Sequence, residues 1–142
     1  MVKLLMWILI LLLGLPTWLL GDEPPPELIA AISRWESDNN DLAVGDKHLP
    51  EKQWAYGRLQ IRQICVDDVN RRYGTKYQAK DCLGNPKLSY WICRVYIDMW
   101  ATEKRLGRKS TNKDMARIWN GGPQGWKKKA TEQYWLNVRQ YL

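Results

Sequence analysis

The chain has 142 residues and a formal net charge of +7, because 22 Lys and Arg residues outnumber 15 Asp and Glu residues. This length suits a single domain with a core of its own and excludes an assembly of several large domains. The basic balance favours a polyanionic partner, which includes cell-wall polymers, membrane surfaces and nucleic acids, and it does not choose among them.

The beginning of the chain has the layout of a secretory signal peptide. A short positive start precedes the apolar run 4–13, and a processing site is expected after Gly21. The apolar run is short for a membrane span. Leu19 is larger than the residue usually found three positions before a cut, so an uncleaved N-terminal anchor remains an alternative. We predict a signal peptide over 1–21, a domain over 22–142, and a secreted or periplasmic location.

Cys65, Cys82 and Cys93 are the three cysteines of the chain. Export permits a disulfide, and the odd count leaves one thiol over. Cys82 and Cys93 would close the shortest loop, but the sequence leaves the pairing open. The spacing is unlike that of a zinc site, and His48 is the single histidine, so we expect no metal and no cofactor. A Cys–His nucleophilic pair would lack an identifiable third group to orient it.

The first predicted helix spans 25–37 and carries a carboxylate on its apolar stripe. Glu36 lies four residues after Ile32 and seven after Ile29, so helical geometry places it on the core-facing side. Burial would raise its pKa, and an acid with a pKa of about 6 can protonate a glycosidic oxygen at neutral pH. The alternative is a Glu36 that turns to solvent or caps a nearby loop. The stripe consists of Leu28, Ile29, Ile32 and Trp35.

The remaining pattern predicts an α+β fold that is predominantly helical, with one small β patch and no internal repeat. Thr111 or Ser110 can cap one of the later helices, and Asp114 would complete a capping box with Thr111. The predicted elements are a long loop or irregular β region over 38–56, a strand over 57–61, and helices over about 62–72, 87–106 (ended by Gly107), 112–120 and 130–141.

Ordered motifs along the chain resemble a known family. Trp35-Glu36-Ser37, Gly57-Arg58-Leu59-Gln60-Ile61 and Ala116-Arg117-Ile118-Trp119-Asn120-Gly121-Gly122-Pro123, followed by Thr131-x-x-Tyr134-Trp135-x-x-Val138, are similar to motifs of the lysozyme superfamily. The resemblance covers about 27–142 and is greatest to invertebrate-type (destabilase-like) lysozymes and bacterial lytic-transglycosylase-like domains. It implies a lysozyme-like fold with the β patch beside a catalytic cleft, and cleavage of peptidoglycan at the β-1,4 bond between MurNAc and GlcNAc.

The same resemblance implies roles for two carboxylates. Glu36 matches the general acid, and Asp46 matches the second carboxylate of the hydrolases. Such groups act by retention when they lie about 5 Å apart and by inversion at about 6.5–9.5 Å. The alternative for Asp46 is a turn residue that bonds to nearby backbone. Lytic transglycosylases need no second carboxylate, because a hydroxyl of the sugar closes an anhydro ring.

Five further residues are implied to bind substrate. Gln60 would lie at the cleft floor and offer its amide to the sugar or to Glu36; otherwise it is an edge-strand side chain in water. Trp119 would pack on a sugar ring or fill core. Asn120 and Gly121 belong to a turn where backbone comes close to substrate, and Tyr134 is a weaker candidate for lining the cleft.

Several features depart from the family pattern. Segment 47–56 is longer than usual and would cover the cleft or displace Asp46. Three cysteines are few for an invertebrate-type lysozyme, which favours a bacterial or phage-derived relative. Some destabilase-like proteins are linked to isopeptide cleavage through Ser and His, which Ser37 and His48 would supply without any geometry to support the pairing. The basic clusters are Arg105, Arg108 and Lys109, and Lys127, Lys128 and Lys129.

The leading interpretation is therefore an exported, monomeric muramidase whose partner is the glycan strand of peptidoglycan. Hydrolysis is preferred to transglycosylation because Asp46 is present. A non-catalytic wall-binding domain is the alternative from another class. Nucleic-acid binding is not expected because no such motif occurs, and membrane contact is expected only through an uncleaved N-terminal segment.

Overall fold

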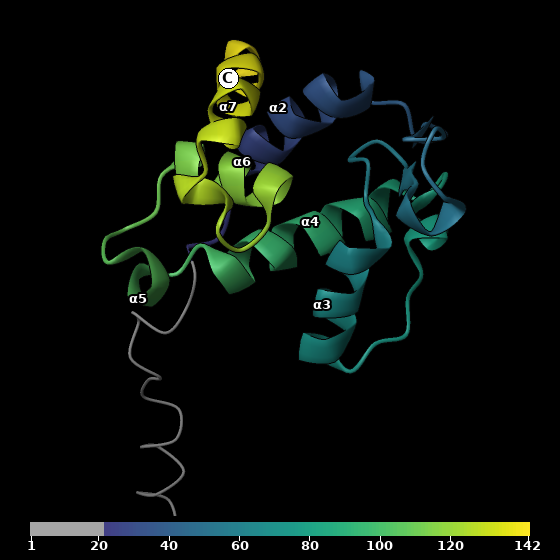
Figure 1. Ribbon diagram of the computed structural model, residues 1–142, viewed down its shortest axis with the longest axis horizontal. Helices are drawn as coiled ribbons and strands as arrows, with labels where there is room; N and C mark the ends of the chain where they lie inside the picture. Colours follow the sequence, from purple (N-terminus) through teal and green to yellow (C-terminus); the bar gives the residue numbers. More distant parts are fainter. Residues whose placement is uncertain (1–21) are drawn as a thin grey trace, which may run out of the picture.

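Helix α4, Pro86–Trp100, runs through the middle of the molecule, and the other elements pack along it (Figure 1). The computed structural model describes residues 22–142, so the predicted signal peptide lies outside the described part. The remaining main elements are α2 Pro26–Ser37, β1 Val44–Gly45, β2 Ala55–Tyr56, α3 Gln63–Tyr73, α5 Glu103–Leu106, α6 Asn112–Gly121 and α7 Glu132–Val138. The fold is thus α+β and mostly helical, as predicted.

The elements form two groups that share α4. Figure 1 shows α6 and α7 gathered with α2 near one end of α4, and α3 with the β hairpin near the other. Short 3-10 turns connect them, namely Glu51–Gln53, Ala79–Cys82, Gly125–Lys127, Lys129–Thr131 and Arg139–Tyr141. No helix within residues 22–142 is both long enough and apolar enough to cross a membrane.

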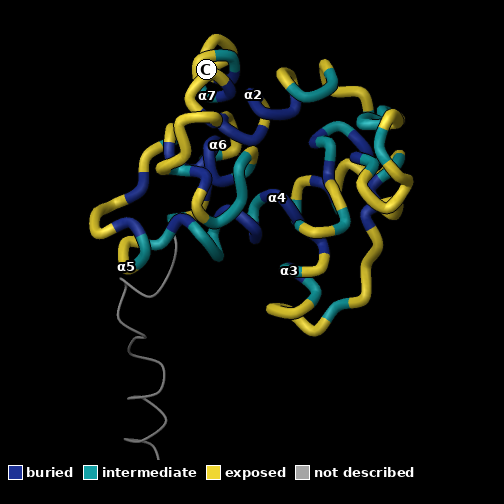
Figure 2. The backbone as a smooth tube through the Cα atoms, viewed as in Figure 1, coloured by how far each residue is buried: buried dark blue, intermediate teal, exposed yellow. Residues whose placement is uncertain are grey.

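One apolar core joins the two groups, and buried segments occur in every main helix, including Leu106 at the end of the short α5 (Figure 2). Leu28, Ile29 and Ile32 of α2 are buried as predicted, but Trp35 is 42% exposed, so its assignment to the core stripe was wrong. It lies in the last turn of α2, where the hydrogen bond from Tyr134 of α7 goes to the neighbouring Glu36. The largest fully buried side chains are Leu28, Ile32, Leu59, Ile61, Ile92, Ile97 and Ile118.

The β region differs from the prediction. The strand expected over 57–61 is a turn, and the antiparallel strands are β1 and β2, with Val44 opposite Tyr56. Gly57 (φ +73°) and Gln60 (φ +52°) adopt left-handed conformations, which interrupt an extended run. A Cβ at Gly57 would lie 2.6 Å from the carbonyl oxygen of Cys82, so this turn requires glycine there.

The long helix predicted over 87–106 is two helices, because the chain leaves α4 after Trp100. The Thr102 hydroxyl accepts a hydrogen bond from the Arg105 N–H (3.3 Å) and starts α5. Gly107, at φ +75°, ends α5. The capping box between Thr111 and Asp114 is confirmed. The last helix, predicted over 130–141, is shorter, with 3-10 turns on both sides of α7.

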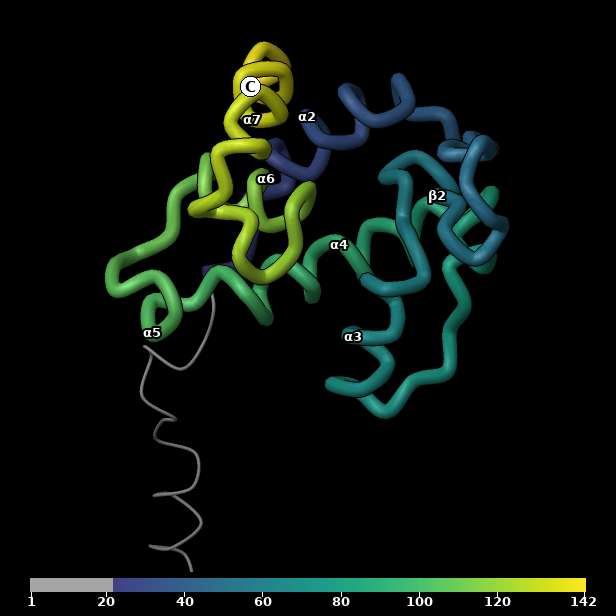
Figure 3. The backbone as a smooth tube through the Cα atoms, in the orientation of Figure 1, coloured from purple at the N-terminus to yellow at the C-terminus, as the bar shows by residue number. Residues whose placement is uncertain are grey.

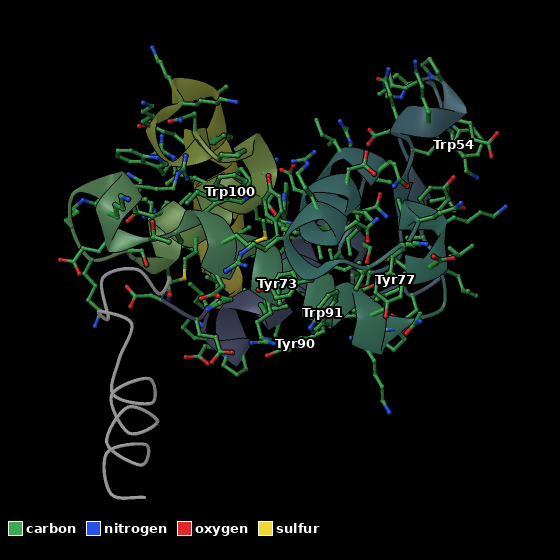
Figure 4. All side chains as sticks on the ribbon, turned by 90° about the horizontal axis from the view of Figure 1, so that it is seen from below. Trp54, Tyr73, Tyr77, Tyr90, Trp91 and Trp100 are labelled. Atoms are coloured by element: carbon green, nitrogen blue, oxygen red, sulfur yellow. The ribbon has the colours of Figure 1, made fainter. Side chains whose placement is uncertain are left out.

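Aromatic and thiol groups complete the packing. Tyr73 and Tyr77 meet Trp91 edge-on, with ring centroids 5.5 and 6.0 Å away (Figure 4). Trp91 and Trp100 are half-buried and pack on the core, so these aromatic residues serve the fold. The cysteines Cys65, Cys82 and Cys93 are free thiols.

Candidate active site

A cleft of about 590 Å³ collects most of the predicted site residues. Its walls come from the end of α2, the β hairpin, the start of α3 and the end of α6. Six of the seven predicted residues line it, namely Glu36, Asp46, Gln60, Trp119, Asn120 and Gly121. Residues that the sequence reasoning did not single out also line it, among them Arg62, Asp68 and Lys128.

A second groove, of about 690 Å³, lies on another side of α2. Its lining is mainly apolar and includes Ile29, Leu59 and Tyr90, and no carboxyl group takes part in it. Although this groove is larger, it holds no carboxyl group that could serve as the acid predicted from the sequence. The cleft that contains Glu36 is therefore the candidate active site.

Glu36 is held at the point where α2 ends. The helix stops because Asp38 takes a left-handed conformation (φ 55°) and donates its N–H to the Arg34 carbonyl at 3.0 Å. The Ser37 hydroxyl donates to the carbonyl oxygen of Arg58 at 2.8 Å, which joins the helix end to the turn that carries Gln60. The position of Glu36 relative to this wall of the cleft is thus fixed by its neighbour Ser37.

The environment of Glu36 favours a protonated carboxyl group. The residue keeps partial contact with solvent at the cleft, but protein atoms surround it densely, and this burial is the largest influence on its pKa. The negative charge of Asp46 acts in the same direction, whereas Tyr134, Arg62 and Trp119 oppose it. The pKa of Glu36 rises from 4.5 to about 7. The group therefore holds a proton up to about neutral pH.

Tyr134 comes from the far end of the chain. Figure 3 shows the C-terminal segment with α7 next to α2, which brings residues 98 positions apart together. The hydroxyl of Tyr134 donates to Oε1 of Glu36 at 2.7 Å. Tyr134 is buried, and burial together with the Glu36 charge keeps its pKa well above 10, so it remains a donor. Tyr134 therefore contacts the carboxyl group of Glu36 but is not among the residues that line the cleft.

Replacing Tyr134 with Phe is expected to raise the pKa of Glu36 above about 7, since the lost hydrogen bond stabilises the charged form. The alkaline limb of any activity that needs protonated Glu36 would then move to higher pH. The carboxyl titration of both proteins by NMR would test this. An unchanged or lower pKa in Tyr134→Phe would contradict the assigned role.

Asp46 forms an ion pair with Arg62, a residue that the sequence motifs did not identify. Its Oδ2 accepts hydrogen bonds from Nη2 of Arg62 at 2.6 Å and from Nε at 3.1 Å. The backbone at Asp46 is left-handed, with φ 60°, and its carbonyl accepts from the Leu49 N–H at 2.8 Å. Asp46 is thus both a turn residue and a cleft carboxylate. A single arginine before a helix carries no sequence signal for this pairing.

The longer segment 47–56 leaves Asp46 in the cleft wall. It forms the 3-10 turn Glu51–Gln53 and strand β2, and the Trp54 indole N–H donates to the Leu49 carbonyl at 2.8 Å. This segment is folded on itself, and Asp46 is among the residues that line the cleft.

Gln60 lines the cleft, but its amide is engaged in its own turn. The Nε2 group donates to the Gly57 carbonyl at 3.0 Å. Its Oε1 lies close over Gly45, where an added Cβ would be only 2.0 Å away. Within residues 22–142 its side chain makes no hydrogen bond to Glu36.

The end of α6 forms the opposite wall. Trp119 is half-buried and meets Tyr96 edge-on at 5.9 Å, so it lines the cleft and packs against the core at once. Asn120 is exposed, and Gly122 (φ +82°) ends the helix. A Cβ at Gly121 would lie 2.5 Å from Cγ2 of Thr131, which explains glycine there.

Two other chemistries considered from the sequence find no matching geometry. The Ser37 hydroxyl is bonded to the Arg58 carbonyl, and among the described residues it makes no hydrogen bond to His48. Cys65, Cys82 and Cys93 all have raised pKa values because they are buried, which disfavours thiolates. In the part of the chain from 22 to 142, no group of three or more His, Cys, Asp or Glu residues is placed to hold a metal ion.

No protein-family model matches the sequence, and no curated protein matches it. Solved structures do match in fold. A chain of the complex between Aeromonas hydrophila PliI and Meretrix lusoria lysozyme aligns with a TM-score of 0.68 and 22% identity, covering 84% of this chain and 92% of that one. Inhibitor-bound lysozyme from Meretrix lusoria gives the same values. Tapes japonica lysozyme aligns with a TM-score of 0.67 and 17% identity, covering 84% and 93%. The chain therefore has a lysozyme-like α+β fold.

Proposed function

We propose that this protein is an exported muramidase that cleaves the β-1,4 bond between MurNAc and GlcNAc in peptidoglycan. The observation that carries the proposal is Glu36, a carboxyl group in the wall of a cleft, bonded to Tyr134 at 2.7 Å and with its pKa raised to about 7. The lysozyme-like fold supports the same class of reaction. The predicted signal peptide over 1–21 supports export.

In the proposed reaction Glu36 gives its proton to the glycosidic oxygen while the bond from that oxygen to the anomeric carbon breaks. The carboxylate of Asp46, in the same cleft, stabilises the positive charge that develops on the sugar ring. A water molecule then adds its oxygen to the anomeric carbon and returns a proton to Glu36. The step is balanced, because Glu36 regains from water the proton that it gave to the leaving oxygen. Asp46 and Arg62 neither gain nor lose a proton.

A second candidate is lytic transglycosylation, and the pair between Asp46 and Arg62 favours it. A carboxylate held at 2.6 Å by a guanidinium is a weaker nucleophile and base than a free one. In that case Glu36 acts alone as acid and base, and the sugar's own hydroxyl attacks the anomeric carbon. The product contains an anhydro ring and is lighter by one water molecule.

The mass of the soluble products from purified peptidoglycan would test the proposal. Reducing-end muropeptides are expected for hydrolysis, and products lighter by one water molecule for transglycosylation. Tight sedimentation with the wall and no product would refute both reactions and leave a wall-binding domain.

A further inference from the structure

Lys128 presents a positioned cation at the rim of the cleft. Its Nζ donates to the carbonyl oxygen of Gly121, at the end of α6, at 2.7 Å. Carbonyl groups at a helix C-terminus favour a cation, so this bond holds the ammonium group beside the cleft. An ammonium group has three N–H donors, and this bond uses one of them.

The backbone beneath Lys128 is held by buried groups. Nη2 of Arg117, a buried residue, donates to the Lys128 carbonyl at 2.7 Å. Nε of Arg117 donates to the Thr131 hydroxyl at 2.9 Å, and that hydroxyl lies 2.9 Å from the same Lys128 carbonyl. These bonds hold the backbone at Lys128 and Thr131, from which the Lys128 side chain extends along the rim of the cleft.

Apart from Glu36 and Lys128, the charged side chains that line the cleft already have partners of opposite charge. Arg62 is bound to Asp46 at 2.6 Å, and Asp68 pairs with Arg71 at 3.0 Å. Within residues 22–142, Lys128 has no carboxylate within 4.0 Å. Among the described residues that line the cleft, Lys128 is thus the cation without an ion-pair partner. A carboxylate on a bound ligand could form a charge-assisted hydrogen bond with its ammonium group.

We propose that Lys128 recognises a carboxylate carried by the bound glycan, so the cleft selects a carboxylated glycan over a neutral one. This inference rests on the proposed function, since it assumes that a glycan occupies the cleft. In peptidoglycan, carboxylates occur on the lactyl ether of MurNAc and on the attached stem peptide. Neutral chitin oligosaccharides have the same β-1,4 linkage and no carboxylate.

Calorimetric binding in a Glu36→Gln background tests this inference without turnover. The probes are a GlcNAc–MurNAc tetrasaccharide with free lactyl carboxylates, the same tetrasaccharide with stem peptides, and chitotetraose. Lys128→Met is expected to weaken binding of a carboxylated probe about 10-fold, the size of one charge-assisted hydrogen bond. Binding of chitotetraose should not change. Lys129→Met, in the adjoining 3-10 turn and outside the cleft lining, is the matched control, and Lys128→Arg should restore most of the affinity.

The outcomes separate this inference from the proposed function. A loss for the peptide-free probe identifies the lactyl carboxylate, and a loss for the peptide-bearing probe alone identifies the stem peptide; either supports the inference. Equal weakening of all three probes, or none, overturns it while leaving glycan cleavage intact. If the protein with intact Lys128 binds no probe and the wild type cleaves no glycan, the proposed function itself fails.

Discussion

Glu36→Gln is expected to lower the rate of glycan cleavage by about 10²- to 10⁴-fold, the usual contribution of a positioned general acid. The amide keeps the size of the side chain and can still accept the hydrogen bond from Tyr134, but it has no proton to give the leaving oxygen. Release of soluble muropeptides measures the effect. Glu51→Gln, an exposed change outside the cleft, is the matched control and should retain full activity. Cleavage at the wild-type rate by Glu36→Gln would exclude the mechanism.

The same substitution has an expected effect on stability with a defined pH window. In the folded protein the pKa of Glu36 is raised from 4.5 to about 7. The contribution of its protonated form to the free energy of unfolding is therefore fully present below pH 4.5 and is lost as pH rises through about 7. The charged group in its buried position costs about 3 kcal/mol above that range. Glu36→Gln should therefore gain up to about 3 kcal/mol relative to wild type between pH 4.5 and pH 8. Urea unfolding at both pH values, with Glu51→Gln beside it, measures this, and a constant difference would contradict it.

Gly125→Ala is expected to cost about 3 kcal/mol of unfolding free energy or more, at the upper end of overpacking effects. A Cβ there would lie 2.0 Å from the carbonyl oxygen of Arg117 and 3.1 Å from Cα of Ile118, both backbone atoms of α6. Backbone within a packed helix cannot move aside cheaply. The displaced segment leads directly to Lys128 and Thr131, so the Arg117 hydrogen bonds would be strained as well.

Gly45→Ala is the control for Gly125→Ala, because the nearest atom to the added Cβ is equally close in both variants. Its Cβ would lie 2.0 Å from Oε1 of Gln60, the end of a flexible side chain. Gln60 can change rotamer, so we expect a stability loss below about 1 kcal/mol. Urea unfolding of the two alanine variants compares them directly. Equal losses would show that the close approach of Gly125 to α6 is not what requires glycine.

Local patterns in the sequence predicted the features that depend on neighbouring residues. The spacing of Ile29 and Ile32 placed Glu36 on the inner side of α2, and the Thr111–Asp114 capping box marked the start of α6. Both follow from helical periodicity and from backbone groups within a few residues, which the order of amino acids specifies directly. The motifs around Gln60 and Asn120 also identified segments that do line the cleft.

Features set by distant residues had no such signal. Two-residue strands are too short to show alternation, and the apolar residues around Gln60 predict a strand where the structure has a left-handed turn. Helical periodicity places Trp35 on the same stripe as Leu28, yet Leu28 is buried and Trp35 is 42% exposed, because tertiary packing decides which turns of a stripe are covered.

The electrostatics of the site arise from three separate parts of the chain. Tyr134 reaches Glu36 across 98 positions, and Arg62 reaches Asp46 across 16. The sequence was sufficient to suggest a buried acid at Glu36, because burial follows from the apolar stripe. The hydrogen bond from Tyr134 to Glu36 depends on the packing of α7, and the ion pair of Asp46 with Arg62 depends on the start of α3. The place of Lys128 at the cleft depends on the fold of the 125–131 segment. Charges act through distance in space, and only the folded chain sets those distances.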